Sequence, residues 1–133
     1  MLDVTSLTKA IDSLQRAIDR TLSARDDEEL RDAVIQRFEY TYELCWRMLK
    51  RRLEMDHPNP AEVDQLSFQG LMREGGERGL IEDVERWMVY RENRNITAHT
   101  YDQKKAEDVY KSAIEFIIDA RKLLLALESS QNA

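Results

Sequence analysis

Apolar side chains recur at three- and four-residue intervals over much of the chain, which is the spacing that places them on one face of a helix. A first predicted helix ends near Arg25, and its stripe comprises Leu7, Ala10, Ile11, Leu14, Ala17, Ile18 and Leu22. A second begins at Asp26, which forms a capping pair with Glu29, and continues to about Met55 without a glycine or proline. The chain therefore begins with two long helices.

The second predicted helix is apolar on more than one face. Its two stripes are Val34, Phe38, Thr41, Cys45 and Met48, and Tyr42, Trp46, Leu49 and Leu53. Such a helix lies at the centre of a fold or forms part of an interface. Because two stripes exceed what one small bundle readily covers, we predict a helical homodimer.

Helix-breaking residues are concentrated in the middle of the chain, where both prolines and all four glycines lie between positions 58 and 79. Asn59 and Pro60 provide the cap and first position of a short third helix, which we expect to end in the glycine cluster. A fourth helix is predicted from about Ile81. A fifth begins near Asp102 and carries the stripe Ala106, Val109, Ala113, Ile114, Ile117, Ala120, Leu124 and Leu127.

Length and composition agree with these patterns. The chain has 133 residues, of which 42% are hydrophobic and 35% charged, enough for one modest core and suited to long helices. We therefore predict an all-α fold, an antiparallel up-and-down bundle of about five helices in one domain over residues 1–133. The amino terminus lacks the features of a signal peptide, and no apolar run is long enough to cross a membrane, so we expect a cytoplasmic protein without membrane association.

Charge and cysteine content restrict the candidate chemistry. A formal net charge of −6 argues against general nucleic-acid binding, although basic residues outnumber acidic ones between positions 86 and 105. The single cysteine, Cys45, lies in an apolar stretch and is interpreted as a buried thiol without a catalytic role. No cluster of histidine, cysteine and carboxylate residues has metal-ligand spacing, so we expect neither a metal nor a cofactor.

An apolar stripe in the fourth predicted helix gives way to polar side chains. Ile81, Val84 and Met88 are followed at the same spacing by Arg91, Asn95 and His99. Polar groups at positions where packing favours apolar ones mark either a helix end that emerges into solvent or a functional site. A polar stripe on the second helix faces either the same site or solvent, and it comprises Gln36, Tyr40, Glu43 and Arg47.

The segment from Arg94 to Tyr101 brings together a cation, an imidazole and a phenol. An arginine can hold a phosphate with a fork of donors, and a histidine can exchange a proton near neutral pH, which are the needs of a metal-free ribonuclease. Arg94 and His99 are five residues apart, about 140° around a regular helix. We therefore expect the helix to end or loosen near Thr97, or Arg94 of one subunit to complete the site of another.

The chain resembles the HEPN superfamily, the higher eukaryotes and prokaryotes nucleotide-binding domains, in particular its HepT or nucleotidyltransferase substrate-binding protein branch. The matching pieces are Gln36 to Trp46, Trp87, and the motif Arg94-Asn95-x-x-x-His99-x-Tyr101. The resemblance implies a small helical ribonuclease that dimerises and lines one cleft with motifs from two subunits. Arg94 and His99 match the family's catalytic positions. We assign Asn95 and Arg91 substrate-binding or supporting roles.

The resemblance also implies a partner and a means of control. Members of this branch act as toxins of type VII-like pairs and are encoded beside an antitoxin, a minimal nucleotidyltransferase. This antitoxin transfers AMP to the tyrosine of the H-x-Tyr element. Tyr101 occupies that position. Two other interpretations stay open. The chain is a noncatalytic subunit that presents a nucleotide or other substrate to a nucleotidyltransferase, or a structural helical adaptor, which leaves the polar interruption of the fourth helix unexplained.

Overall fold

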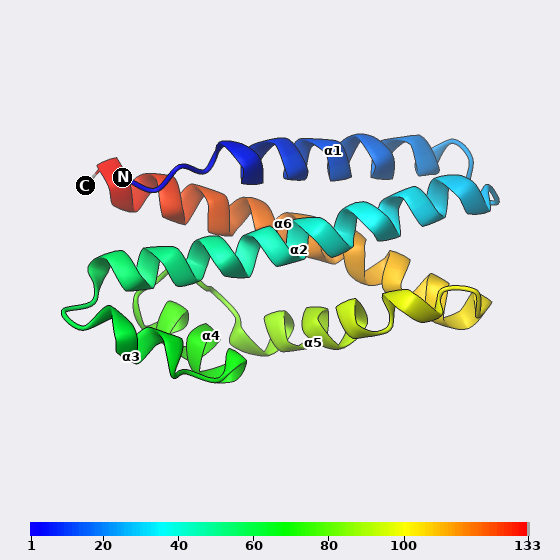
Figure 1. Cartoon of the computed structure of the whole chain (residues 1–133). Helices are drawn as coiled ribbons and strands as arrows, with labels where there is room; N and C mark the ends of the chain where they lie inside the picture. The colour runs from blue at the N-terminus through cyan, green and yellow to red at the C-terminus, as the bar shows by residue number, and fades with distance from the viewer. Residues whose placement is uncertain (133) are drawn as a thin grey trace.

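The computed structural model describes residues 1–132 of the chain and the side chains of residues 1–129. Three long helices lie side by side, and the shorter ones cover the side of the second that faces away from the first (Figure 1). The elements in chain order are α1 (Thr5–Leu22), α2 (Glu28–Asp56), α3 (Pro60–Asp64), α4 (Phe68–Glu77), α5 (Val84–Asn95), the 3₁₀ turn η1 (Thr97–His99) and α6 (Gln103–Asn132).

Helices α1, α2, α5 and α6 form an up-and-down bundle in which each runs antiparallel to the one before it (Figure 1). The short α3 and α4 are inserted between the second and third members of this bundle. The predicted all-α bundle is therefore confirmed, with six α-helices in residues 1–132 where about five were expected. None of the described helices is long and apolar enough to cross a membrane.

The starts of α2 and α6 are set by aspartate caps. Asp27 Oδ1 accepts from the backbone N–H groups of Glu29 and Leu30 at 2.9 and 3.1 Å, so the cap of α2 is Asp27 and not the predicted Asp26. Asp102 caps α6 as predicted, because its Oδ1 accepts from the backbone N–H groups of Lys104 and Lys105. Helices α2 and α6 therefore begin within two residues of their predicted starts, at Glu28 and Gln103.

The predicted third helix is in fact two helices. Ser67 interrupts it and caps α4 by accepting from the Gly70 backbone N–H at 3.0 Å. Three of the four glycines lie inside α4, but the helix ends at Glu77, within the glycine cluster as predicted. Only Gly79, with a φ of 76°, adopts the left-handed conformation that ends a helix.

Gly75 is inside α4 because the helix packs closely on its neighbours. A Cβ atom at this position would lie 2.9 Å from Ile81 Cγ1 and 3.1 Å from Leu49 Cδ1 on α2. The first distance is below what carbon atoms tolerate, so Ile81 would have to move, and the second is tighter than an ordinary contact between α4 and α2. Close contact between these two helices matters for the site, since residues from both line it.

Helix α2 is central, because it contacts every other α-helix of the chain. Both of its predicted apolar stripes are covered within one chain, and of their members only Trp46 is more than marginally accessible. The packing therefore selects the central alternative of the two that the sequence left open. The two apolar stripes of α2 therefore give no support to the predicted homodimer, because neither needs a partner subunit to cover it.

Aromatic side chains fill the core where α2, α5 and α6 meet. Phe116 contacts Phe38, Tyr42, Trp87 and Tyr90, with ring centroids 5.1–6.0 Å apart. Trp87 and Tyr90 are thus the buried face of α5. The predicted core face of α5, the stripe that includes Val84 and Met88, is wrong, because both of these residues are only half-buried.

A buried polar contact fixes α5 against α6. The Tyr90 hydroxyl donates to Asp119 Oδ2, which also accepts from Arg86 Nε at 2.8 Å. Burial, followed by the hydrogen bond to Asp119, raises the pKa of Tyr90 well above its ordinary value, so the phenol stays protonated and donates. This contact holds the helix that carries Arg94.

Candidate functional site

Arg94 on the last turn of α5 points across to two carboxylates on α2. Its Nε donates to Glu43 Oε1 at 3.0 Å, and its Nη2 lies 3.5 Å from Glu39 Oε1. The Arg94 side chain is half-buried, with 30% of its surface exposed. Two carboxylates on a neighbouring helix fix the orientation of this guanidinium. The hydrogen bonds are charge-assisted and are therefore stronger than bonds between neutral groups.

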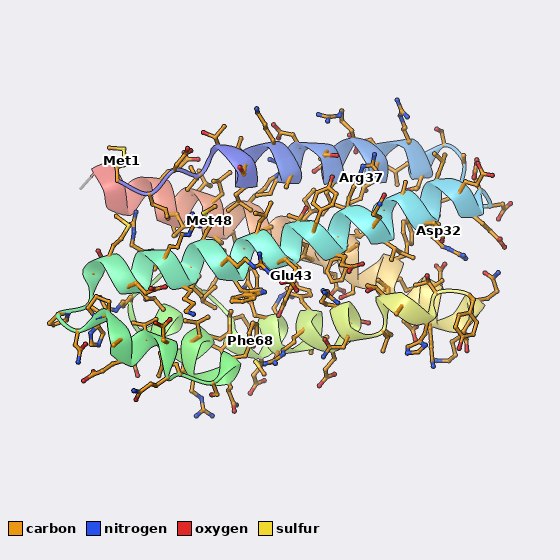
Figure 2. The ribbon with its side chains drawn as sticks, viewed as in Figure 1. Met1, Asp32, Arg37, Glu43, Met48 and Phe68 are labelled. Carbon is orange, nitrogen blue, oxygen red and sulfur yellow. The ribbon has the colours of Figure 1, made fainter. Side chains whose placement is uncertain are left out.

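Glu43 is itself held in place. Its second oxygen accepts from Trp46 Nε1 at 3.1 Å and lies 3.6 Å from Arg47 Nη2. Figure 2 shows Glu43 on the side of α2 that faces away from α1, the side on which α5 lies. The carboxylate therefore joins three donors from two helices. In the part of the chain that the structure describes, no hydrogen bond engages Nη1 of Arg94, so that nitrogen can serve a ligand.

His99 lies beyond the end of α5. The helix ends at Asn95, and the turn η1 follows with the His99 backbone N–H donating to the Ile96 carbonyl at 3.0 Å. The predicted end of the helix near Thr97 is confirmed. The imidazole is exposed, and no hydrogen bond or ion pair engages it among residues 1–129.

Tyr101 follows in the connection to α6. Its side chain is 82% exposed, and its ring lies edge-on to that of His99 with centroids 6.1 Å apart. Arg94 and His99, in contrast, are not joined by any hydrogen bond or ion pair of the described residues. Within one chain, Arg94 faces α2 while His99 and Tyr101 face solvent.

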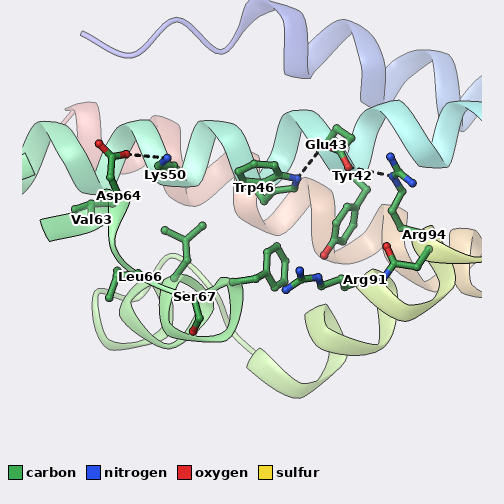
Figure 3. A pocket seen from close by; sticks show the side chains of 13 residues that line it. Tyr42, Glu43, Trp46, Lys50, Val63, Asp64, Leu66, Ser67, Arg91 and Arg94 are labelled. Atoms are coloured by element: carbon green, nitrogen blue, oxygen red, sulfur yellow. Dashed lines mark hydrogen bonds and ion pairs between the residues drawn. The ribbon is translucent and has the colours of Figure 1, made fainter. Parts of the chain in front are cut away.

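A pocket of about 330 Å³ lies between α2, α3, α4 and α5 (Figure 3). It includes three of the five candidate site residues, Arg91, Arg94 and Asn95, whereas His99 and Tyr101 lie outside its lining. The α2 wall is formed by Tyr42, Glu43, Trp46 and Lys50, and α4 contributes Phe68 and Leu71. The guanidinium of Arg91 lies over the ring of Phe68, 4.3 Å from its centroid.

Only part of the α2 side of this site was predicted from the sequence. Of the polar stripe on α2, Glu43 does face the site, but Tyr40 donates to Ser13 of α1 and Gln36 is exposed. Glu39, which pairs with Arg94, was missed altogether. A usable signal existed, because Glu39 and Glu43 are spaced i,i+4 and both lie in the segment that carries the family resemblance.

Two further expectations from the sequence concern Cys45 and metal binding. Cys45 is fully buried, and burial raises the pKa of its thiol far above the ordinary value, in keeping with the predicted inert thiol. Among the described residues, no group of three or more histidine, cysteine, aspartate or glutamate side chains is placed to hold a metal ion.

Comparison with known proteins gives a consistent set of relatives. The family model described as "Nucleotidyltransferase substrate binding protein like" matches residues 2–129. A curated Haemophilus influenzae protein named "Probable ribonuclease HepT" is 44% identical over 90 residues. That alignment covers 68% of this chain but only 62% of the relative, which is less than two thirds of the relative's length.

Solved structures show the same fold. A Haemophilus influenzae structure, described as the fold of a substrate-binding domain of a nucleotidyltransferase, has a TM-score of 0.89 at 34% identity, covering 95% of this chain and 99% of that one. A crystal structure from Thermus thermophilus has a TM-score of 0.73 at 26% identity, covering 91% and 98% of the two chains. The likeness therefore extends over nearly the whole bundle.

Proposed function

The chain belongs to the nucleotidyltransferase substrate-binding protein-like family, and on that premise we propose that it is a ribonuclease that cleaves RNA without a metal ion. The observation that carries the proposal is the fixed Arg94 guanidinium with an unengaged Nη1, on the same segment as the exposed imidazole of His99. The name of the Haemophilus influenzae relative, a probable ribonuclease, supports the same reaction class.

The proposed reaction is an internal transesterification. His99 removes the proton from a ribose 2′-hydroxyl, and the 2′-oxygen then bonds to the adjacent phosphorus. The bond from phosphorus to the 5′-oxygen of the next nucleotide breaks, and that oxygen takes a proton from water. The products are a 2′,3′-cyclic phosphate and a 5′-hydroxyl, and the reaction needs no metal ion.

Arg94 supplies the electrostatic part of the reaction. Negative charge grows on the nonbridging phosphoryl oxygens as the 2′-oxygen attacks, and a preorganised cation stabilises that charge. Glu43 and Glu39 fix the guanidinium from its Nε and Nη2 side, so it does not need to reorganise when the phosphate arrives. Asn95 and Arg91, one turn apart on the same helix, are proposed to bind or orient the substrate.

Arg94 and His99 are proposed to meet across a twofold homodimer. Within one chain they make no direct contact, and Arg94 faces α2 while His99 faces solvent. A site that uses Arg94 of one chain and the partner subunit's His99 removes this separation, and a twofold axis provides two such sites. The family resemblance of the Arg94-to-Tyr101 motif supports this arrangement.

We also propose that the protein acts as the toxin of a type VII-like toxin-antitoxin pair, and that a minimal nucleotidyltransferase neutralises it by transferring AMP to Tyr101. The exposure of the Tyr101 phenol, 82%, suits access by a modifying enzyme. An AMP group there would add negative charge and bulk beside the His99 ring, whose centroid is 6.1 Å away. Such a group would block the cleft and compete for Arg94.

The pocket favours a second candidate function, a noncatalytic subunit that binds a nucleotide for a partner nucleotidyltransferase. Aromatic walls and nearby cations suit a nucleotide whether or not cleavage follows.

One experiment separates the two functions. The purified protein is incubated, in the presence of a metal chelator, with an RNA oligonucleotide and with the same sequence carrying 2′-deoxyribose throughout. We expect cleavage of the RNA alone, with cyclic phosphate ends. Intact RNA at high protein concentration overturns the ribonuclease, and cleavage of both strands overturns the 2′-hydroxyl mechanism.

A further inference from the structure

The hydroxyl group of Tyr42 has no hydrogen-bond partner in the described part of the chain, although the residue is 99% buried. Buried polar groups in proteins nearly always have a partner, so an orphan hydroxyl at the wall of a pocket calls for an explanation. Tyr42 lines the pocket between α2 and α5. Burial raises its pKa well above the ordinary value, so the hydroxyl keeps its proton and can donate.

Aromatic side chains pack around the Tyr42 ring. The ring of Phe68 stacks on that of Tyr42 at 24°, with centroids 6.1 Å apart, and it meets Trp46 edge-on at 6.3 Å. Figure 3 shows Tyr42 reaching from α2 toward Arg91 on α5. The guanidinium of Arg91 covers Phe68 and, among the described residues, has no carboxylate partner. Of the five charged residues that line the pocket, Arg91 is therefore the one that can move without breaking an ion pair of the described residues.

The charges around the pocket suit a phosphate at one side only. Lys50 is paired with Asp64 at 2.8 Å, and Arg94 is paired with Glu43 through Nε. Arg91 and the Nη1 of Arg94 keep donors for an anion on the α5 side. A ligand with a flat aromatic part toward Tyr42 and a phosphate toward α5 matches this distribution.

We propose that this pocket binds one unpaired nucleobase of the RNA strand, and that it is the base-recognition subsite beside the cleavage centre. The base displaces Arg91 from the face of Phe68, stacks there, and accepts a hydrogen bond from Tyr42 through a ring nitrogen or carbonyl. Arg91 and Arg94 then hold the adjoining phosphate. A volume of about 330 Å³ accommodates one nucleoside and excludes a base pair, so the strand must be single at this position.

The assignment of the base to RNA rests on the proposed ribonuclease function, whereas the binding of a base does not. The same chemistry is present in a free nucleoside monophosphate. The test therefore uses two probes, a short fluorescent single-stranded RNA and AMP. It is done on the His99→Ala protein, so that the RNA stays intact during the measurement.

Three variants on this background address the pocket. Tyr42→Phe removes only the orphan hydroxyl, Phe68→Leu removes the stacking surface, and Tyr40→Phe is the matched control, since its hydroxyl bonds to Ser13 of α1. RNA affinity is measured by fluorescence anisotropy, and a change in the summed emission of Trp46 and Trp87 reports stacking in the pocket. Thermal unfolding is recorded for each variant.

We expect Tyr42→Phe to weaken RNA binding about fivefold to tenfold, the effect of one lost hydrogen bond, without lowering the unfolding temperature. Phe68→Leu should weaken it by about tenfold or more through lost stacking. Tyr40→Phe should leave the affinity unchanged. If the His99→Ala protein and its three variants all bind RNA with equal affinity, the pocket is not a base subsite and the proposal is overturned.

The two probes distinguish this proposal from the one on which it rests. If AMP binds and loses affinity in Tyr42→Phe while RNA is neither bound by His99→Ala nor cut by the wild type, the base pocket stands and the ribonuclease fails. If the wild type cuts RNA and neither probe depends on Tyr42 or Phe68, the ribonuclease stands and the subsite is overturned.

Discussion

The Nε of Arg94 on α5 donates to the carboxylate of Glu43 on α2 across 3.0 Å, joining residues 51 positions apart in the sequence. This contact positions the cation that the proposed reaction needs. We predict that Glu43→Ala lowers kcat by about 10- to 100-fold, because a misaligned guanidinium stabilises the phosphoryl oxygens less well. Substrate affinity should change little.

The control for this prediction is the neighbouring Arg47→Ala. Arg47 lies 3.6 Å from the same carboxylate but has a side chain that is 64% exposed, so its loss should have little effect. A positioning role also predicts non-additivity, so Glu43→Ala should add no further loss to Arg94→Ala. Additive effects of the two substitutions would contradict it.

Stability should fall at alkaline pH. The pKa values of Cys45, Tyr42 and Tyr90 are all raised by burial above ordinary values of 9.0 for the thiol and 10.0 for the phenols. The unfolded chain therefore releases these protons at lower pH than the folded one. Stability is full below about pH 9 and falls as pH rises through the unfolded values, each group contributing at most about 1.4 kcal/mol per pH unit.

Urea unfolding at a series of pH values checks this prediction. The midpoint should be level from neutral pH to about pH 9 and then decrease, and Tyr42→Phe should make the decrease shallower. A midpoint that stays constant up to pH 11 would show that these groups ionise equally in the folded and unfolded chains.

The helices that carry the core were predictable from the sequence because periodicity reports which face of a helix is buried. The stripe of α1 is buried except at its last residue, Leu22. On α5 the same reasoning chose the wrong face, since Val84 and Met88 have the same helical spacing as a buried stripe but Trp87 and Tyr90 fill the core. Spacing alone does not decide between two such faces.

Contacts between distant segments were not predictable. Gly75 was predicted as part of a helix stop, but it lies inside α4 at a point of close approach to Ile81 and to Leu49 on α2. The pairing of Arg94 with Glu39 and Glu43 depends on how α5 is aligned along α2, which no local pattern specifies. The end of α5 was predictable because it is local to the motif.

Modification of Tyr101 is the third prediction. Incubation with a cognate minimal nucleotidyltransferase, ATP and magnesium should add one or more AMP groups to Tyr101, and the modified protein should lose ribonuclease activity. Intact-mass spectrometry of the wild type and Tyr101→Phe makes the comparison. Labelling of the phenylalanine variant to the same extent would place the acceptor elsewhere.

Sharing of the site between subunits is the fourth prediction. Light scattering should find a homodimer at micromolar concentration. Arg94→Ala and His99→Ala homodimers should each be inactive, whereas mixed dimers regain one complete site. A 1:1 mixture refolded together should then recover about one quarter of wild-type activity, from half of the dimers with one site of two. A monomer, or a mixture that stays inactive while the wild type cleaves, contradicts the shared site.

The central claim is that Arg94 and His99 cleave RNA, and RNA cleavage by matched proteins in the presence of a chelator tests it most directly. We predict that the wild type cleaves, that Arg94→Ala is about 100- to 1,000-fold slower, and that His99→Ala is about 100- to 10,000-fold slower. Circular dichroism should show the same helical content in all three proteins. Cleavage at the wild-type rate by His99→Ala, or none by the wild type, would contradict the account.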